Sequence, residues 1–326
     1  MKTVHWGIIG CGDVTEKKSG PAFNKVDHSQ LVAVMRRDGE KAKDYARRHG
    51  VSKWYDNAQQ LIEDNDVDAV YVATPPLFHE EYTILALQAG KPVYVEKPMA
   101  VHTQAAENMY AASRQSGSKL SIAHYRRQQP LFKKIKVLLD TNAVGNVLMA
   151  NIQLFQGTHP ALHAKTASNW RIDPEVAGGG LFHDLAPHQL DLMLYYFGKP
   201  QNSSGISLNQ GGEYQADDMV TGYILFENGV VFNGSWSFGV APEDDRDTCE
   251  IIGSEGVIRF SIFKNHEIIL SRHGNTETFI FEPLQHVQQP MIESVVRYFR
   301  NEGPNPCSGE EGIETMRLID SFTKKK

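Results

Sequence analysis

The stretch that decides the fold is Val4-His5-Trp6-Gly7-Ile8-Ile9-Gly10-Cys11-Gly12-Asp13-Val14-Thr15, close to the start of the chain. Its first seven residues predict a buried strand, and the glycines that follow predict a tight turn. Gly10 and Gly12 match the first two glycines of the dinucleotide fingerprint, which permit the turn and let the backbone approach a pyrophosphate. Thr15 stands where the third Gly or Ala is usual. Asp13 and Val14 would begin a helix whose first N–H groups face the phosphates.

Short apolar runs alternate with amphipathic, charge-rich segments as far as about residue 125. The pattern predicts strands over residues 4–10, 31–35, 69–73, 92–95 and 120–123, and helices over residues 39–49, 58–63, 78–89 and 103–116. Apolar runs without alternation, separated by helices, are typical of a parallel sheet covered on both faces. We therefore expect residues 1–123 to form an α/β Rossmann domain, a doubly wound parallel sheet that binds a dinucleotide.

The chain beyond residue 145 has a different pattern. Short turns such as Asn228-Gly229 join predicted strands over residues 147–156, 218–227, 230–238, 247–253, 256–262, 267–271 and 276–281. Consecutive strands without helices between them indicate an antiparallel sheet. Helices are predicted over residues 181–197 and 290–301. Residues 124–326 are therefore expected to form an α+β domain with a large, mostly antiparallel open sheet.

The composition is that of an ordinary globular protein. The chain has 326 residues, of which 41% are hydrophobic and 22% charged, and a formal net charge of −6. Only the end of the chain, residues 324–326, is a basic run, so we expect no nucleic-acid partner. Cys11, Cys249 and Cys307 lie far apart, which favours a reducing, cytoplasmic compartment over a disulfide framework. No signal-peptide pattern and no run of about eighteen apolar residues occurs, so we expect no membrane association.

The end of the second predicted strand bears on the choice of dinucleotide. In NAD-binding domains an acidic residue at this place binds the ribose 2′-hydroxyl. Here the strand ends Met35-Arg36-Arg37-Asp38, so Arg36 occupies the acidic position and Arg37 follows it. A guanidinium can bind a 2′-phosphate through two hydrogen bonds and can stack on adenine. We therefore expect NADP. NAD is the alternative, in which Asp38 contacts the ribose and both arginines are surface charges.

Further motifs follow in a fixed order. They are Ala73-Thr74-Pro75-Pro76 with His79, Glu96-Lys97-Pro98, Trp170-Arg171, and Gly178-Gly179-Gly180 with Asp184, His188 and Asp191. Together with the opening glycine turn, they make the chain resemble the glucose–fructose oxidoreductase / inositol dehydrogenase / rhizopine catabolism (Gfo/Idh/MocA) family over nearly its whole length. The resemblance implies a nicotinamide-dependent oxidoreductase that acts on a sugar, cyclitol or related polyol. It also implies that the second domain binds the substrate and forms homodimers or homotetramers through its sheet.

The resemblance assigns site residues as well. It implies catalysis by Lys97, Asp184 and His188, which would also bind the substrate. It implies a dinucleotide groove that includes Thr74, Pro75, His79, Glu96, Lys97, Trp170 and Arg171, the last two near the nicotinamide. Tyr125 and Arg127, which follow the fifth predicted strand together with His124 and Arg126, are candidate substrate-binding residues. Their mixture of polar and aromatic groups suits a polyhydroxylated ligand.

Hydride transfer at a carbinol carbon requires a proton acceptor and a group that stabilises the developing oxyanion. Lys97 directly follows a parallel strand, at the sheet edge where open α/β folds place their ligands. His188 is expected to take the substrate proton in the oxidative direction. Asp184 precedes it by four residues and would orient it from the same face of a helix. Pro187 falls inside this helix and is expected to kink it or to start a new turn.

Other functions on the same fold stay open at this point. A dinucleotide-dependent glycosidase would oxidise a sugar transiently without net change of the cofactor. A non-catalytic dinucleotide sensor or co-repressor would not need Lys97 and His188. A trans-dihydrodiol or biliverdin-type reductase would need a more apolar pocket than residues 124–127 suggest. We expect no metal, because Pro160 separates the one pair with ligand spacing, His159 and His163, and no third ligand is evident.

Overall fold

The computed structural model of the chain describes residues 3–157 and 170–324. They form two compact units: unit 1 comprises residues 1–128 and 284–316, and unit 2 comprises residues 129–283 and 317–326. This division differs from the single boundary between residues 123 and 124 that the sequence predicts, because a late segment returns to unit 1. There the N–H of Ile122 donates to the carbonyl oxygen of Cys307 at 3.0 Å, and the Asn305 side chain donates to that of Leu120 at 2.8 Å.

The sheet of unit 1 has six parallel strands. They are β1 (Val4–Ile9), β2 (Ser29–Met35), β3 (Lys53–Tyr55), β4 (Ala69–Val72), β5 (Val93–Val95) and β6 (Leu120–Ile122). Their order across the sheet is β3-β2-β1-β4-β5-β6, with every neighbouring pair parallel. The order runs outward in both directions from β1, which confirms the doubly wound sheet. Every residue of β4, β5 and β6 is buried, as their continuous apolar runs predict.

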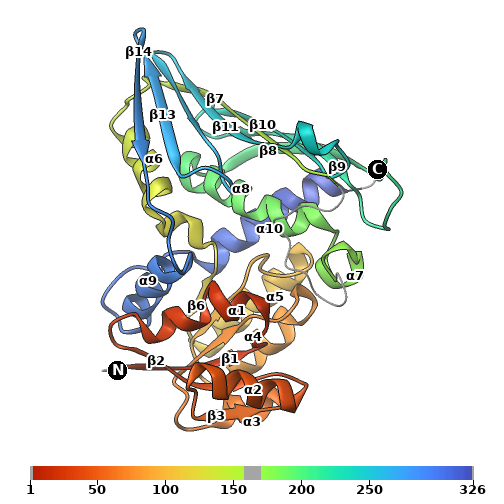
Figure 1. The fold of residues 1–326 in the computed structure, drawn as a ribbon, viewed down its shortest axis with the longest axis vertical. Coiled ribbons are helices and arrows are strands. Elements are labelled where there is room, and N and C mark those ends of the chain that lie inside the picture. Colours follow the sequence, from red (N-terminus) through yellow and green to blue (C-terminus); the bar gives the residue numbers. More distant parts are fainter. Residues whose placement is uncertain (1–2, 158–169, 325–326) are drawn as a thin grey trace. The chain divides into compact units, whose positions relative to one another are not determined.

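Helices connect the strands of unit 1 or follow its last strand, and they lie around its sheet (Figure 1). They are α1 (Asp13–Lys17), η1 (Gly20–Asn24), α2 (Gly39–His49), α3 (Ala58–Glu63), η2 (Pro76–Phe78), α4 (His79–Gln88), α5 (Thr103–Ser116), η3 (Tyr125–Gln128), α9 (Gln289–Phe299) and the first half of α10 (Gly309–Thr323). Asp38 and Asn57 cap the N-termini of α2 and α3 with their side chains.

Unit 2 is built on an eight-stranded sheet. Its strands are β7 (Val147–Phe155), β8 (Pro200–Leu208), β9 (Met219–Phe226), β10 (Val231–Ser237), β11 (Arg246–Gly253), β12 (Gly256–Phe260), β13 (Glu267–Arg272) and β14 (Asn275–Ile280). Their order is β14-β13-β12-β11-β7-β10-β9-β8. All neighbours are antiparallel except β7 and β10. The predicted open, mostly antiparallel sheet is confirmed.

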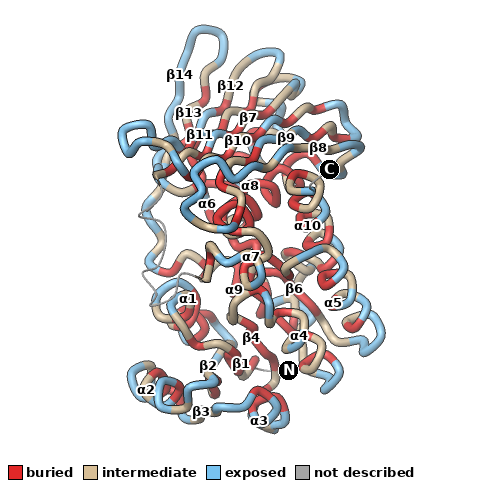
Figure 2. Tube along the Cα trace, turned by 90° about the vertical axis from the view of Figure 1, so that its right-hand side faces the viewer, coloured by how far each residue is buried: buried red, intermediate tan, exposed pale blue. Residues whose placement is uncertain are grey.

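The helices of unit 2 are α6 (Pro130–Asp140), η4 (Trp170–Ile172), α7 (Pro174–Ala177), α8 (Leu181–Phe197), η5 (Pro242–Asp244) and the end of α10. Helix α8 is the core of this unit, since 15 of its 17 residues are buried (Figure 2). The Phe182 ring meets the Trp236 ring edge-on with centroids 5.0 Å apart, and Phe322 packs on Trp236. Polar residues on such a helix are held inside the protein. Within the two described stretches, no helix is long and apolar enough to cross a membrane.

Candidate active site

The glycine turn between β1 and α1 leaves room for a ligand. Gly10 has a φ of +95°, and a Cβ there would lie 2.7 Å from the backbone nitrogen of Thr74, so only glycine fits. A Cβ on Gly12 would meet nothing nearer than the Gly10 carbonyl oxygen at 3.9 Å. Packing therefore does not require a glycine at position 12, whereas close approach of a pyrophosphate does. Asp13 and Val14 begin α1, where first-turn N–H groups have no helical acceptor.

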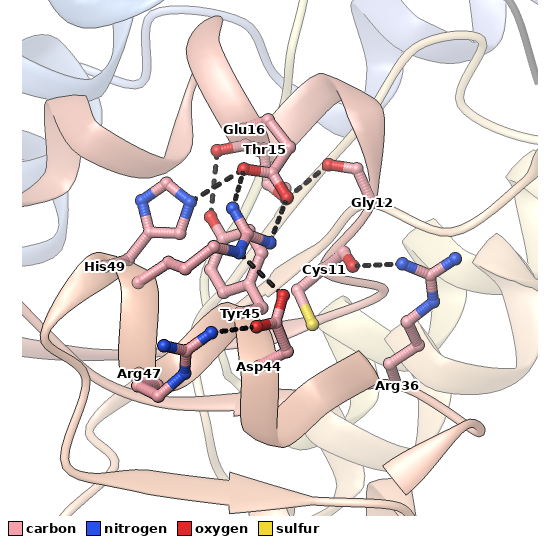
Figure 3. Close-up of polar contacts among 10 residues, drawn as sticks. Cys11, Gly12, Thr15, Glu16, Arg36, Asp44, Tyr45, Arg47 and His49 are labelled. Carbon is pink, nitrogen blue, oxygen red and sulfur yellow. Dashed lines mark hydrogen bonds and ion pairs between the residues drawn. The ribbon is translucent and has the colours of Figure 1, made fainter. Parts of the chain in front are cut away.

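The departure from the fingerprint at Thr15 has a local explanation. Thr15 is fully buried, its hydroxyl donates to the Gly12 carbonyl oxygen at 2.7 Å, and the Tyr45 hydroxyl donates to its own carbonyl oxygen at 2.8 Å (Figure 3). The next residue, Glu16, is bound by Arg48 at 2.7 and 2.8 Å and by His49 at 2.8 Å. Hydrogen bonds from Arg48 lower the pKa of Glu16. The only carboxylates of α1 are Asp13 and Glu16, and Glu16 is thus neutralised by its partners.

The residues after β2 reach the same turn. Arg36 is half-buried, and its guanidinium donates to the Cys11 carbonyl oxygen at 3.3 Å (Figure 3). Arg37 lies with its guanidinium carbon 4.6 Å from the centre of the Phe78 ring. Asp38 accepts from the Lys41 N–H at 3.2 Å and pairs with the Lys41 ammonium at 3.0 Å. Because Asp38 caps α2, Arg36 is the side chain of this strand end that extends over the glycine turn.

The segment after β4 lies next to Gly10. Thr74 has a buried hydroxyl oxygen that finds no hydrogen-bond partner within the described residues. Pro75 is half-buried, so it can face a ligand. His79 is fully buried, and its ring nitrogens lie 2.8 Å from the Thr74 carbonyl oxygen and 3.0 Å from that of Pro98. Burial lowers the pKa of His79. His79 thus links the loop after β4 to the loop after β5.

The Glu96-Lys97-Pro98 motif follows β5 at the same sheet edge. Lys97 is half-buried, whereas Glu96 is 5% exposed and both of its carboxylate oxygens accept hydrogen bonds from neighbouring groups. Four neighbouring strands, β1, β2, β4 and β5, each end next to a residue of the candidate site. The glycine turn follows β1, Arg36 follows β2, and the segments with Thr74 and Lys97 follow β4 and β5. Unit 1 therefore brings a lysine to the edge that carries the predicted dinucleotide turn.

The two predicted substrate-binding residues after β6 lie deep in unit 1. Tyr125 is 6% exposed and Arg127 is 2% exposed. Arg127 pairs with Glu311 of α10. Burial opposes ionisation of Glu311, but Arg127 outweighs it and the pKa of this carboxyl is lowered. Arg127 therefore fastens the returning segment to unit 1, a structural task that its sequence context did not indicate.

In unit 2 the Trp170-Arg171 motif is tied to α8. The Arg171 Nε lies 3.2 Å from the Asp184 Oδ2, and its guanidinium carbon lies 4.5 Å from the centre of the Trp170 ring. The Arg171 side chain is 9% exposed, and its Nη1 is buried without a hydrogen-bond partner in the described part of the chain. The ion pair orients the Asp184 carboxylate. Nothing in the spacing of these two residues indicates the pair.

The predicted base, His188, is 5% exposed on α8, and its ring meets that of Phe263 edge-on with centroids 5.8 Å apart. Helix α8 runs from Leu181 to Phe197 without interruption at Pro187. Asp184 and His188 are therefore one turn apart on the same side of one helix. Asp191 is 1% exposed on the next turn.

The glycine loop before α8 lies against a second buried histidine, His183. Gly179 has a φ of +158°, and a Cβ there would lie 2.1 Å from the His183 ring. A Cβ on Gly180 would lie 2.4 Å from the Ala216 Cβ. His183 is 5% exposed, and burial lowers its pKa to about 4. The loop thus closes over a neutral imidazole at the start of the helix that carries Asp184 and His188.

His183 should make the fold sensitive to acid. Its pKa is depressed from its usual value near 6.5, so the unfolded chain binds the proton more readily than the folded one between pH 6.5 and about 4. The stability due to the neutral ring is complete above pH 6.5 and is lost as the pH falls towards 4. At about 1.4 kcal/mol per pKa unit, the loss is about 3 kcal/mol. Urea unfolding at the two pH values measures it.

His183→Gln is expected to remove most of this pH dependence, whereas His273→Gln is the control because His273 is an exposed residue. An equal acid-induced loss in wild type and His183→Gln would show that other groups cause it.

The described residues hold no group of three or more His, Cys, Asp or Glu side chains that could bind a metal ion. His159 and His163 lie outside the described residues. All three cysteines are buried thiols, and burial raises the pKa of Cys11 to about 12.

Two family models match the chain. The Rossmann NAD-binding domain of the GFO/IDH/MocA oxidoreductase family matches residues 4–124, and the GFO/IDH/MocA C-terminal domain matches residues 132–259. Oxidoreductase P35 of Formosa agariphila is 47% identical over 98% of each chain. The 1,5-anhydro-D-fructose reductase of Ensifer adhaerens is 29% identical over 69% of this chain and 67% of its own length.

The chain is also similar to a diol dehydrogenase and to a solved structure. The trans-1,2-dihydrobenzene-1,2-diol dehydrogenase of Oryctolagus cuniculus is 31% identical over 77% of this chain and 72% of its own length. Among solved structures, levoglucosan dehydrogenase in complex with NADH matches with a TM-score of 0.88 over 98% of this chain and 96% of its own, at 21% identity. At that identity the likeness shows the fold alone.

Proposed function

Because the chain belongs to the Gfo/Idh/MocA family of NAD(P)-dependent oxidoreductases, we propose that it moves a hydride between NADP and a carbinol or carbonyl carbon of a sugar, cyclitol or related polyol. The observation that carries the proposal is the edge of the unit 1 sheet. There the glycine turn and three side chains follow four neighbouring strands, β1, β2, β4 and β5; the side chains are Arg36, Thr74 and Lys97. A relative is named as a reductase of 1,5-anhydro-D-fructose, which supports the choice of a sugar.

The residues of unit 1 fit a dinucleotide. The open space beside Gly12 and the first N–H groups of α1 suit a pyrophosphate, and the partnerless Thr74 hydroxyl supplies a further donor. Arg36 would bind the 2′-phosphate. Pro75 would complete the groove, while Trp170 and Arg171 of unit 2 are proposed to serve the nicotinamide end. When bound, the nicotinamide ring supplies the hydride donor or acceptor.

Lys97 is proposed to hydrogen-bond the reacting oxygen of the substrate. As this oxygen gains negative charge, the ammonium stabilises it more strongly than it stabilises the neutral hydroxyl or carbonyl, which lowers the barrier. A lysine suits this task because its ammonium presents three donors on a mobile stem.

His188 is proposed to accept the substrate hydroxyl proton during oxidation and to return it during reduction. Asp184 orients the imidazole from the preceding turn, and Arg171 holds the carboxylate through the 3.2 Å ion pair. Tyr125 and Arg127 remain proposed neighbours of the substrate, although the ion pair to Glu311 already accounts for the placement of Arg127.

A substrate screen tests the proposed function. Absorbance of reduced nicotinamide would be followed with NADP(H) and NAD(H) against sugars, inositols, keto-sugars and, in view of the diol dehydrogenase relative, aromatic trans-diols. Turnover of a carbohydrate with NADP(H) is expected. Release of nitrophenol from a glycoside without net cofactor change would instead indicate a glycosidase, and tight NADP binding without any turnover would indicate a sensor.

Arg36→Ala should reverse the cofactor preference. A charge-assisted bond to phosphate contributes about 1.5–3 kcal/mol, so kcat/KM with NADP is expected to fall about tenfold to a hundredfold. The value with NAD should change little, since NAD has no 2′-phosphate. Arg47→Ala is the matched control, because Arg47 is an exposed arginine of α2 that pairs with Asp44 at 2.6 Å. A wild-type preference for NAD would contradict the assignment of Arg36.

We also propose that the protein forms a homodimer or homotetramer through the sheet of unit 2. Ile206 and Leu208 of β8 are 60% and 48% exposed, and Tyr223 of the neighbouring β9 is 40% exposed. Their register places all three on one face of the sheet. Light scattering of the purified chain measures the assembly.

The buried cysteine thiols fit the reducing cytoplasm that the sequence favours.

A further inference from the structure

The residue before Lys97 has contacts that point to a different task from cofactor binding. We propose that Glu96 is a positioning residue, which fixes the backbone of Lys97 relative to the glycine turn, and that Tyr71 and Gln288 hold its carboxylate in place. The inference rests on the proposed function, because it requires Lys97 to be the group that contacts the reacting oxygen. All of the residues involved belong to unit 1.

The carboxylate of Glu96 is fully engaged within the protein. Its Oε1 accepts from the Tyr71 hydroxyl at 2.5 Å and from the Gln288 side-chain amide at 2.5 Å. Its Oε2 accepts from the backbone N–H of Lys97 at 3.1 Å. Glu96 is 5% exposed, so little of it can meet a ligand. Three donors on a buried carboxylate restrict its side chain to one rotamer, and the rotamer in turn restrains the Lys97 amide.

The two side chains that donate to the Glu96 carboxylate are themselves fixed in place. Tyr71 and Gln288 have no exposed surface. Burial and the charge of Glu96 raise the pKa of Tyr71 well above its usual range, so its hydroxyl stays a donor. The Gln288 side chain must turn its NH₂ to the carboxylate, which leaves its oxygen to accept from the Tyr94 hydroxyl at 3.1 Å. Gln288 also precedes α9, and its backbone N–H donates to the Lys18 carbonyl oxygen at 3.3 Å.

The contacts continue to the glycine turn. The Tyr71 hydroxyl oxygen lies 3.1 Å from the Ser19 Oγ, and the Ser19 backbone N–H donates to the Val14 carbonyl oxygen at 3.3 Å. Val14 lies in the first turn of α1, directly after the glycines. A buried chain of hydrogen bonds therefore connects the predicted pyrophosphate-binding turn to the Lys97 backbone.

The other flank of Lys97 is held as well. A ring nitrogen of His79 lies 3.0 Å from the carbonyl oxygen of Pro98, while the second ring nitrogen contacts Thr74. The Lys97 backbone is thus anchored before and after the residue, and only its side chain extends from the two anchors. Catalysis depends steeply on such placement, since a displacement of about 1 Å can reduce a rate about a hundredfold.

Tyr71→Phe and Gln288→Met test the proposal, because each keeps the volume of the side chain and removes one donor to Glu96. Three measurements apply: hydrogen exchange of the peptide that contains Lys97, the dissociation constant of NADPH from its fluorescence, and kcat. We expect faster exchange at Lys97 in both variants. We expect kcat to fall about tenfold in each and further in the double variant. The NADPH dissociation constant should stay within about twofold of wild type, since the phosphate-binding residues are unchanged.

Tyr55→Phe is the matched control. The Tyr55 hydroxyl also donates to a carboxylate, that of Asp64 at 2.8 Å, but it lies on the edge strand β3 of the same unit. It should leave both kcat and exchange at Lys97 unchanged. If Tyr71→Phe does not fold, Glu96→Gln replaces it, because an amide of equal size faces the same three donors with one acceptor oxygen fewer. Glu96→Gln is expected to show the same division between kcat and NADPH binding.

Three results would overturn the proposal. Wild-type exchange at Lys97 and wild-type kcat in both variants would show that Glu96 keeps its position without the hydrogen bonds from Tyr71 and Gln288. A loss of NADPH affinity in step with kcat would show that the network serves the dinucleotide. An equal loss in Tyr55→Phe would show general destabilisation. Failure of the proposed function is distinguishable from all three, since it would appear as an inactive wild type or a fully active Lys97→Ala variant, and the exchange measurement would still report on the network.

Discussion

Lys97→Ala is expected to lower kcat by about a hundredfold to a thousandfold while NADPH still binds. Removal of one donor that stabilises a developing oxyanion has an effect of this size in other enzymes. The dinucleotide should be retained because the glycine turn and Arg36 do not depend on the Lys97 side chain. The kinetic signature is a fall of kcat and kcat/KM by similar factors, which marks an interaction made in the transition state.

Two variants sharpen this experiment. Lys97→Arg keeps a positive charge but changes its shape and reach, so partial activity is expected. Lys53→Ala is the control. Lys53 lies on the edge strand β3 of the same unit, and its ammonium pairs with Asp64 at 2.8 Å, so its removal should leave kcat at the wild-type level. Turnover by Lys97→Ala within about threefold of wild type would refute the oxyanion role, since one such donor is expected to matter far more.

His188→Ala is expected to lower kcat about a hundredfold to ten-thousandfold, the usual contribution of a positioned general base. The pH profile is the more diagnostic readout. In wild type, oxidation should slow as the pH falls through the pKa of the base, because a protonated imidazole cannot accept the hydroxyl proton. In His188→Ala this limb of the profile should disappear. The residual rate should instead rise steadily with pH, as expected when hydroxide replaces the base.

Asp184→Asn separates orientation from proton transfer. It keeps the size of the side chain but removes the charge that pairs with Arg171, so a smaller loss than that of His188→Ala is expected, with the acid limb retained. His273→Ala, at an exposed position, is the control for histidine replacement. An unchanged pH profile in His188→Ala would assign the base to another group.

Much of the fold could be predicted because burial leaves a direct signal. The strands β1, β4 and β5 are continuous apolar runs, and the turn at Asn228-Gly229 has hairpin chemistry. Elements without such signals were missed. Strand β3 has three residues, none of them buried, and pairs with β2 alone. Strand β8 (Pro200–Leu208) mixes Ser, Gly and Asn and has no buried residue. Its pairing with β9 alone makes it a strand.

The candidate site likewise has features that the sequence predicts and features that it does not. Residue types at strand ends, such as Gly10 and Lys97, could be placed from local order alone. Partnerships between distant residues could not, because Gln288 lies 192 positions after Glu96 and no periodic pattern connects them. The same holds for the fully buried His79, whose ring nitrogens contact the carbonyl oxygens of Thr74 and Pro98 in two different loops. The sequence predicts that Pro187 kinks its helix or starts a new turn, yet α8 continues through it from Leu181 to Phe197.

Direct transfer of a hydride between NADP and a sugar-like carbon is the proposed reaction of this chain. Its most direct test uses the substrate found in the screen, labelled with deuterium at the reacting carbon, with oxidised NADP and mass spectrometry of the cofactor. We expect the deuterium to appear on the nicotinamide ring with wild type, and to appear there at a greatly reduced rate with Lys97→Ala. Oxidised substrate without deuterium in the cofactor, or deuterium lost to water, would contradict it.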